Sequence, residues 1–167
     1  MSDLKYLSAY PEHILLQIEQ LQQQNRLGQY ILQRYPQVHD VRNNKALYAY
    51  VMEIKNTCLK KSPPLSKIIY DDKVKAQNAL GTHSRVSRVQ GGKLKAKKEI
   101  RIDDRFKLMP EAFLRMIVVH ELAHIKEMEH NKAFYSLCRY MEPDYHQLEL
   151  DLRIYLTYLD TEPSLYL

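Results

Sequence analysis

Long apolar runs are absent from this chain of 167 residues, and no stretch approaches the length that spans a membrane. Residues 1–11 also contain no apolar segment of signal-peptide length. Cysteine is rare, and Cys58 and Cys138 show neither a C-x-x-C motif nor any other paired spacing. We interpret both as reduced structural thiols. These absences predict a soluble, cytoplasmic protein that has no membrane partner.

Glycine is also scarce, with 4 residues beside 7 prolines, whereas 45% of the residues are hydrophobic. This composition predicts a folded globular protein rather than a low-complexity chain. The length suits one domain with its own core. We therefore expect a single domain over residues 1–167, with N-terminal helices in 1–62 and a sheet with metal-binding helices in 63–167.

Residues 120–124 read H-E-x-x-H, the pattern of zinc hydrolases. Positions four apart lie on one face of a helix, so His120 and His124 can offer nitrogens to one metal ion. Glu121 can reach a water on that metal without being a ligand. Catalytic zinc typically keeps three protein ligands and one open position, and a nearby carboxylate can take the proton of the water. The motif predicts a zinc hydrolase with Glu121 as general base.

The segment before this motif is almost wholly apolar from residue 113 to residue 119, which predicts a buried helix. Pro110 and Glu111 suit its start, by fixed φ and by charge at the positive end of the helix dipole. Histidines and a glutamate on a buried helix need partners, because unpaired buried polar groups are costly. This context favours a real metal site over a chance match.

The third ligand is expected to be His130, six residues after His124. A continuous helix would carry it about 9 Å further along the axis, so the chain must bend between the two. Metzincins bend at a glycine, and the corresponding residue here is Glu127. Asn131 could instead cap a new helix and leave His130 in the corner. The rival third ligand is a carboxylate further along the chain: Glu142, Glu149 or Asp151.

The remaining pattern alternates helices with a short β region. Apolar spacing predicts helices over residues 11–34 with a break near Gly28, from about 44 to about 61 with Asn44 as its cap, and over 132–141 and 145–159. Strands are expected at 68–70, 85–90 and 93–103, the last two joined through Gly91-Gly92. The fold class is therefore α+β, with a small antiparallel sheet packed on the H-E-x-x-H helix between flanking helices.

Basic residues crowd residues 85–101 of the predicted hairpin, where Glu99 is the only acid. The candidates for binding phosphate or another acidic substrate are Arg85, Arg88, Lys93, Lys95 and Lys97. The alternative is a solvated edge guarded by lysines. Alternate residues of a strand share a face, so Lys93, Lys95 and Lys97 lie on one face and Lys98 lies on the other.

Three runs together resemble the YgjP-like metal-dependent hydrolases: FLRMIVVHELAH at 113–124, HNKAFY at 130–135 and SRVQGGKLKAK at 87–97. The wider group has a zincin-like fold and is related in motif to SprT-like and WLM-type proteases. The resemblance implies that His120, His124 and His130 bind zinc and that Glu121 is the general base. Many relatives carry a Trp-Gly-Ser-Cys-like segment where this chain has Leu80-Gly81-Thr82-His83, and this chain has no tryptophan.

Two enzyme functions follow from such a site. The first is a metallopeptidase in which the metal polarises a scissile carbonyl and Glu121 activates water, with Tyr135, Tyr145 or His146 as a further donor to the oxyanion. The alternative is a nucleoside triphosphate pyrophosphohydrolase, for example from UTP to UMP and pyrophosphate, in which the basic hairpin holds the phosphates. No Gly-rich phosphate loop supports the alternative.

A DNA-associated, SprT-like protease ranks last, since no zinc ribbon or basic tail is present. The expected partner is thus a peptide or a nucleotide rather than nucleic acid, and the sequence leaves the oligomeric state open.

Overall fold

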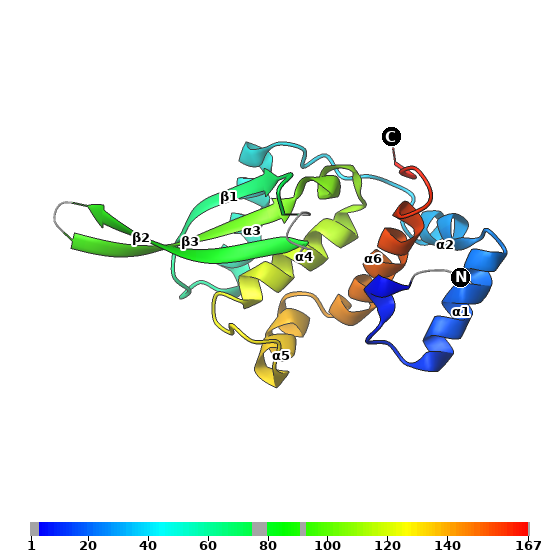
Figure 1. Cartoon of the computed structure of the whole chain (residues 1–167). Coiled ribbons are helices and arrows are strands. Elements are labelled where there is room, and N and C mark those ends of the chain that lie inside the picture. Colours follow the sequence, from blue (N-terminus) through cyan, green and yellow to red (C-terminus); the bar gives the residue numbers. More distant parts are fainter. Residues whose placement is uncertain (1–3, 75–79, 91–92, 167) are drawn as a thin grey trace.

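The computed structural model describes residues 4–74, 80–90 and 93–166, and it describes their side chains except for those of 82–90 and 93–97. The elements in chain order are η1 (Lys5–Leu7), α1 (Glu12–Gln23), α2 (Leu27–Arg34), α3 (Asn44–Cys58), β1 (Leu65–Asp71), β2 (Gly81–Gln90), β3 (Lys93–Asp103), η3 (Asp104–Leu108), α4 (Glu111–Ala123), α5 (Lys132–Met141) and α6 (Tyr145–Leu159). Figure 1 shows this order, with α4 in the middle of the molecule. The predicted α+β class is confirmed. None of the described helices is both long and apolar enough to cross a membrane.

The core is built around α4, which carries the H-E-x-x-H residues at its C-terminal end. Its buried residues lie on all sides of the helix: Phe113, Leu114, Met116, Ile117, Val118, Val119, Glu121, Leu122 and Ala123. A helix that is apolar all round belongs in an interior, and here the sheet, α5 and α6 surround it. As predicted, the helix begins at Pro110 and Glu111. The H-E-x-x-H residues therefore lie on a helix that is buried on all sides.

The sheet has three strands in the order β1-β3-β2. β2 and β3 form the predicted antiparallel hairpin, but β1 lies parallel to β3, so the prediction of an antiparallel sheet is wrong for this pairing. The physical reason is burial. β3 carries Ile100 and Ile102, both almost completely buried, and it takes the central position beside Ile68 and Tyr70 of β1. The more polar β2 is left at the edge.

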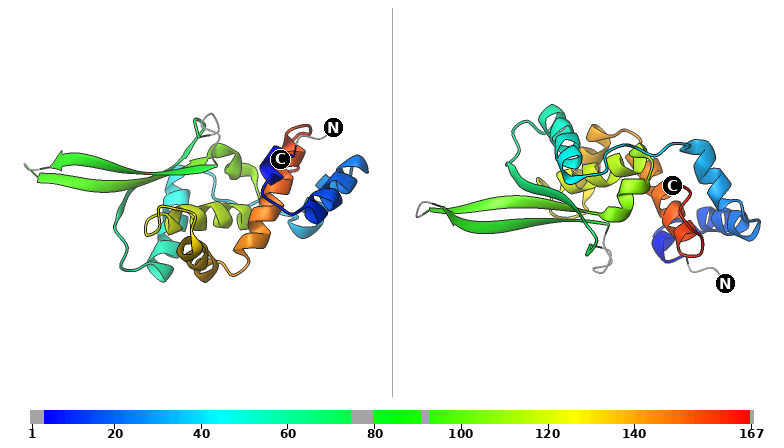
Figure 2. Two further views of the ribbon diagram at one scale, coloured as in Figure 1. Left: turned by 60° about the horizontal axis from the view of Figure 1, so that its bottom comes forward. Right: turned by 90° about the horizontal axis from the view of Figure 1, so that it is seen from above.

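Helices α3 and α4 cover one face of this sheet, as the two views in Figure 2 show. The far end of the β2–β3 hairpin extends beyond the helices, on the opposite side of the molecule from α1 and α2 (Figures 1 and 2). The pairing is continuous from Gly81 opposite Ile102 to Gln90 opposite Lys93. An unbroken register means that alternate positions keep their faces along the whole hairpin.

Two predicted helix details differ in the structure. The N-terminal helical region breaks at Asn25, which has a φ of 54°, rather than at Gly28, which lies inside α2. Asparagine tolerates this left-handed conformation better than most residues. Asn43, rather than Asn44, caps α3, by accepting a hydrogen bond from the Ala46 amide at 2.8 Å. Asn44 instead accepts one from the Tyr70 amide of β1 at 2.9 Å, which ties α3 to the sheet.

Asp151 of α6 joins the N-terminal helices to the rest of the molecule. Its carboxylate is completely buried. It accepts hydrogen bonds from the Tyr30 hydroxyl at 2.9 Å, the Tyr35 hydroxyl at 2.5 Å and the Arg34 guanidinium at 3.1 Å. The Gln147 amide adds a fourth, at 3.1 Å. We refer to Asp151, Tyr30, Arg34 and Tyr35 as the Asp151 latch.

Candidate metal centre

Three histidines converge at the C-terminal end of α4. The Nε2 atoms of His120 and His124 lie 3.2 Å apart, those of His124 and His130 lie 3.0 Å apart, and those of His130 and His120 lie 3.3 Å apart. His124 is buried, His120 is half-buried and His130 is exposed. The cluster therefore faces solvent on the side of His130, where a substrate can enter.

The chain bends between His124 and His130 without a glycine. His124 is the residue after the last turn of α4, and the amides of Lys126 and Glu127 still bond to the Ala123 carbonyl. The next helix, α5, then begins after Asn131, whose side chain accepts a hydrogen bond from the Phe134 amide at 2.9 Å. The predicted cap is confirmed. His130 is thus held in the corner between two helices.

Phe134, in the first turn of α5, forms a common packing surface for the three imidazoles. Its ring centroid lies 5.0 Å from that of His120, 4.5 Å from that of His124 and 5.0 Å from that of His130. The side chain is completely buried. Sequence reasoning did not single it out, although its position four residues after His130 places it next to that histidine once α5 is capped.

Hydrogen bonds fix the tautomers of two of these histidines. His124 Nδ1 lies 2.9 Å from the Glu127 carbonyl, which can only accept, so His124 carries its proton on Nδ1. His120 Nδ1 lies 2.8 Å from the Tyr145 hydroxyl, and that hydroxyl donates to Glu149 Oε2 at 2.9 Å. A phenol has one proton, so His120 must donate from Nδ1 to the phenol oxygen. Both rings therefore direct Nε2 lone pairs toward the centre of the cluster.

This arrangement fits a metal ion. Two nitrogen lone pairs that face each other at 3.2 Å make no hydrogen bond and repel unless a cation lies near both. Zinc binds histidine nitrogens at about 2.0–2.1 Å, so nitrogens that share one tetrahedral ion lie about 3.3 Å apart. The three separations, between 3.0 and 3.3 Å, are close to that spacing. Three neutral imidazoles also belong to the donor sets that zinc accepts.

Glu121 is buried beside the cluster, with 2% of its surface exposed. Its carboxylate lies against the backbone of Gly81, at the start of β2. A Cβ atom at position 81 would lie 2.9 Å from Oε1 of Glu121 and 3.1 Å from its Cδ. Glycine thus leaves the space in which the carboxylate sits, which sequence reasoning missed because the two residues lie forty positions apart.

The rival third ligands have other partners. Glu142 accepts from Arg115 Nε at 3.0 Å and from the Asp144 amide at 3.0 Å. Asp151 belongs to the latch on the far side of α6. Glu149 bonds to Tyr145 and lies 3.7 Å from Arg153 Nε.

The three predicted oxyanion donors also differ in their partners and in their distance from the histidine cluster. Tyr145 is completely buried between His120 and Glu149, and burial, followed by the Glu149 carboxylate, raises its pKa. His146 Nε2 lies 3.1 Å from Arg139 Nη1 on an exposed surface. The Tyr135 ring centroid lies 6.5 Å from that of His130. Of the three, Tyr135 remains the one beside the open side of the cluster.

The side chains of the predicted phosphate-binding residues Arg85, Arg88, Lys93, Lys95 and Lys97 lie outside the described part of the structure. Their neighbour Lys98 is described, and its Nζ donates to the Ile125 carbonyl, in the loop after α4, at 2.6 Å. The register pairs Arg85 with Lys98, so these two positions share a face of the hairpin. Positions 88, 93, 95 and 97 alternate onto the other face.

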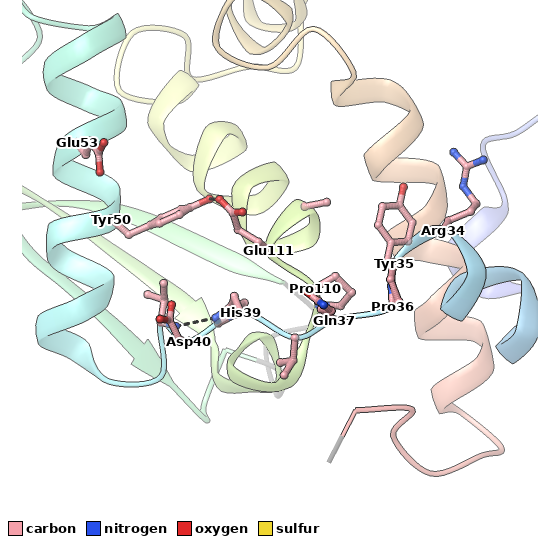
Figure 3. A pocket seen from close by; sticks show the side chains of 13 residues that line it. Arg34, Tyr35, Pro36, Gln37, His39, Asp40, Tyr50, Glu53, Pro110 and Glu111 are labelled. Carbon is pink, nitrogen blue, oxygen red and sulfur yellow. Dashed lines mark hydrogen bonds between the residues drawn. The ribbon is translucent and has the colours of Figure 1, made fainter.

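Figure 3 shows a pocket at the opposite end of α4, near Pro110 and Glu111. Nine residues separate Glu111 from His120, which corresponds to about 13 Å along the helix. His39 in its wall has both ring nitrogens engaged, with the Phe106 carbonyl at 2.6 Å and the Val41 amide at 2.9 Å. Tyr50 donates to Glu111 at 3.3 Å. The pocket is separate from the histidine cluster.

Both cysteines are free, as the sequence predicts. Cys138 on α5 is completely buried, and burial raises the pKa of its thiol to about 12. A thiol with such a pKa remains protonated and is a poor nucleophile or ligand.

Comparison with known proteins agrees with this geometry. Residues 12–155 match the model of a family described as YgjP-like, metallopeptidase domain. The chain is 57% identical over 160 residues to a protein of Escherichia coli (strain K12) named UTP pyrophosphatase, and the alignment covers 95% of this chain and 96% of that protein. No solved structure matches the chain.

Proposed function

Because this chain belongs to the YgjP-like metallopeptidase family, it is a metal-dependent hydrolase, and we propose that its substrate is a nucleoside triphosphate, with UTP hydrolysed to UMP and pyrophosphate. The observation that carries the substrate is the 57% identity, over nearly the whole length of both chains, to a protein named UTP pyrophosphatase. Such nucleotide hydrolysis is better supported than peptide hydrolysis, which rests on the description of the family. A cytoplasmic location, where nucleoside triphosphates are abundant, is part of the proposal.

The proposed cofactor is one zinc ion held by His120, His124 and His130. The support is the convergence of three Nε2 atoms within 3.3 Å of one another and the Nδ1–H tautomers of His120 and His124. When bound, the ion supplies Lewis acidity, which acidifies a water molecule and stabilises negative charge on the phosphoryl group under attack.

Glu121 is the proposed general base. Its position next to His120 and its burial keep the carboxylate near the attacking water and away from bulk solvent. The carboxylate accepts a proton as the water oxygen bonds to the α-phosphorus. The bond from the α-phosphorus to the bridging oxygen then breaks, and pyrophosphate leaves. General-base assistance of this kind typically contributes about 10²–10⁴-fold in rate.

Basic residues of the β2–β3 hairpin are proposed to bind the polyphosphate. Among them, Arg85 is favoured by its position opposite Lys98, whose Nζ reaches the loop between His124 and His130. A guanidinium binds phosphate oxygens in pairs, which suits a triphosphate better than a neutral peptide. Arg88, Lys93, Lys95 and Lys97 would contribute from the other face of the hairpin.

The test is product analysis with the zinc-loaded protein in water enriched in ¹⁸O. Attack at the α-phosphorus places the label in UMP, whereas attack at the β-phosphorus places it in pyrophosphate. We expect UMP and pyrophosphate from UTP, with ¹⁸O in UMP only. Formation of UDP and phosphate, or cleavage of a peptide library without any nucleotide hydrolysis, would overturn the proposal. Glu121→Gln serves as the inactive control.

A further inference from the structure

Behind His120, on the side away from His124 and His130, α6 presents two polar residues one turn apart. Tyr145 is completely buried. It lies 2.8 Å from His120 Nδ1 and donates to Glu149 Oε2 at 2.9 Å. Glu149 in turn forms an ion pair with Arg153 at 3.7 Å. A buried tyrosine between a histidine and a carboxylate costs desolvation, so it calls for a function.

The direction of these hydrogen bonds gives that function. The single phenolic proton points to Glu149, and the phenol oxygen therefore accepts the Nδ1 proton of His120. The carboxylate draws the phenolic proton toward itself, which makes the phenol oxygen a stronger acceptor. A stronger acceptor at Nδ1 in turn makes Nε2 a better electron donor. The chain of contacts ends at the atom that faces the metal centre.

We infer that Tyr145 and Glu149 are positioning residues for the metal ligand His120: together they fix its ring orientation and tautomer and increase the basicity of its Nε2. The inference rests on the proposed metal site. It assigns both residues differently from their sequence-based roles, because a phenol engaged on both sides is not a donor to the substrate and a carboxylate bound to that phenol is not the third ligand.

His124 provides an internal comparison. Its Nδ1 proton goes to the Glu127 carbonyl at 2.9 Å, so its orientation is set by the backbone and survives side-chain substitution. The partner of His120 Nδ1 is instead a side-chain hydroxyl, that of Tyr145. Substitution of Tyr145 should therefore weaken metal binding through His120, while the orientation of His124 is unaffected.

The test compares the zinc affinity of two tyrosine-to-phenylalanine variants. Tyr145→Phe keeps the ring but leaves His120 Nδ1 without its acceptor. Tyr155→Phe is the matched control, since Tyr155 is also buried on α6 but its hydroxyl contacts Ser164 at 3.3 Å, away from the histidines. Competition against a chromophoric chelator gives the zinc Kd of each. We expect Kd to rise by about 10–100-fold for Tyr145→Phe, which is typical of lost partners of metal ligands, and to stay within about twofold for Tyr155→Phe.

A second variant separates positioning from folding. Glu149→Gln keeps a hydrogen-bond acceptor for Tyr145 but removes the charge, so we expect a smaller rise in Kd than for Tyr145→Phe, with circular dichroism and thermal unfolding near those of the parent. The visible absorption of the cobalt-loaded protein should shift in Tyr145→Phe and not in Tyr155→Phe. Equal zinc Kd values for Tyr145→Phe and the parent would overturn the inference. If His120→Ala also leaves the Kd unchanged, the proposed metal site itself is wrong, so the two failures are distinguishable.

Discussion

Glu121 illustrates how much a single residue contributes at this site. Its proposed role is to accept a proton and not to bind the metal, so replacing it should change the chemistry more than the metal centre. We expect Glu121→Gln to lower kcat for UTP by about 10²–10⁴-fold, because the neutral amide cannot accept the proton of the attacking water. Zinc content by atomic absorption should stay at the parent value. Undiminished turnover with normal zinc would show that Glu121 is not the base.

Gly81 has no side chain, and this leaves space for the carboxylate of Glu121. A methyl group there would lie 2.9 Å from Glu121 Oε1 and would push the carboxylate aside. Small displacements of a catalytic group can cost about 10²-fold, so we expect Gly81→Ala to lower kcat by about ten- to a hundredfold while zinc affinity is kept. Gly28→Ala is the control, because its Cβ would meet Tyr158 at 3.0 Å, in a different part of the fold. Equal losses of kcat in both variants would point to general destabilisation instead.

At this scale the sequence was informative only where residues lie close along the chain. Residues 120–124 are recognisable because their spacing is that of a helix turn. Gly81 and Tyr145 reach the same site from positions about forty and twenty-five residues away, and no local pattern encodes such contacts. Tyr145 looked like a candidate donor to substrate, and its actual partners became visible only in three dimensions.

Among the elements, the turn from α4 to α5 decides which residue can be the third ligand. We expect His130→Ala to reduce zinc affinity by orders of magnitude, since one of three nitrogens is lost. Glu142→Ala is the matched control: it removes the contact with Arg115 at 3.0 Å but no candidate ligand. The zinc Kd of each variant, measured against a chelator, distinguishes the two. If His130→Ala retains zinc and Glu142→Ala loses it, the third ligand is the Glu142 carboxylate and not His130.

The hairpin is the element whose role the sequence left most open. Its two faces can now be tested separately. We expect Arg85→Gln to raise KM for UTP by about tenfold, because position 85 lies opposite Lys98, whose Nζ reaches the loop between His124 and His130. The variant with Lys93, Lys95 and Lys97 all replaced by Gln should raise KM less, since these positions lie on the other face. Initial rates at two salt concentrations provide the measurement. A larger KM effect in the triple variant would assign the polyphosphate to that face.

The boundaries of the two C-terminal helices were predictable, whereas the starts of β1 and β2, predicted at residues 68 and 85 and found at Leu65 and Gly81, and the arrangement of the strands were not. The helices over 132–141 and 145–159 begin and end as predicted, because caps and prolines act locally. Strand order has no such signal. β3 lies next to β1 because it carries the buried isoleucines Ile100 and Ile102, although β2, with 10 residues against 11 in β3, is nearly as long. The periodicity indicates a strand but not its neighbours.

For the molecule as a whole, α6 connects the metal centre to the N-terminal helices. Near its start, Tyr145 and Glu149 lie on the side of His120, and Asp151, two residues after Glu149, holds Tyr30, Arg34 and Tyr35. Burial of Tyr30, followed by the charge of the Asp151 carboxylate, raises the pKa of the Tyr30 phenol to about 12. The phenol therefore remains a hydrogen-bond donor throughout the neutral range. If the chain is a single domain, as the sequence predicts, these contacts should make both halves unfold together.

Asp151→Asn tests this coupling. The amide keeps the size of the side chain but replaces one acceptor oxygen with a donor, which faces donors from Arg34 and Tyr35 and leaves buried polar groups unpaired. We expect a loss of about 1–3 kcal/mol in the free energy of unfolding.

Asp160→Asn is the control, because its pairing with Lys5 at 3.6 Å is partly exposed and such pairs contribute about 0–1 kcal/mol. Urea denaturation followed by circular dichroism should show one transition at a lower midpoint for Asp151→Asn, with zinc affinity unchanged while the protein is folded. Two separate transitions would divide the chain into two folding units, and a loss of zinc from the folded variant would place Asp151 in the metal centre after all.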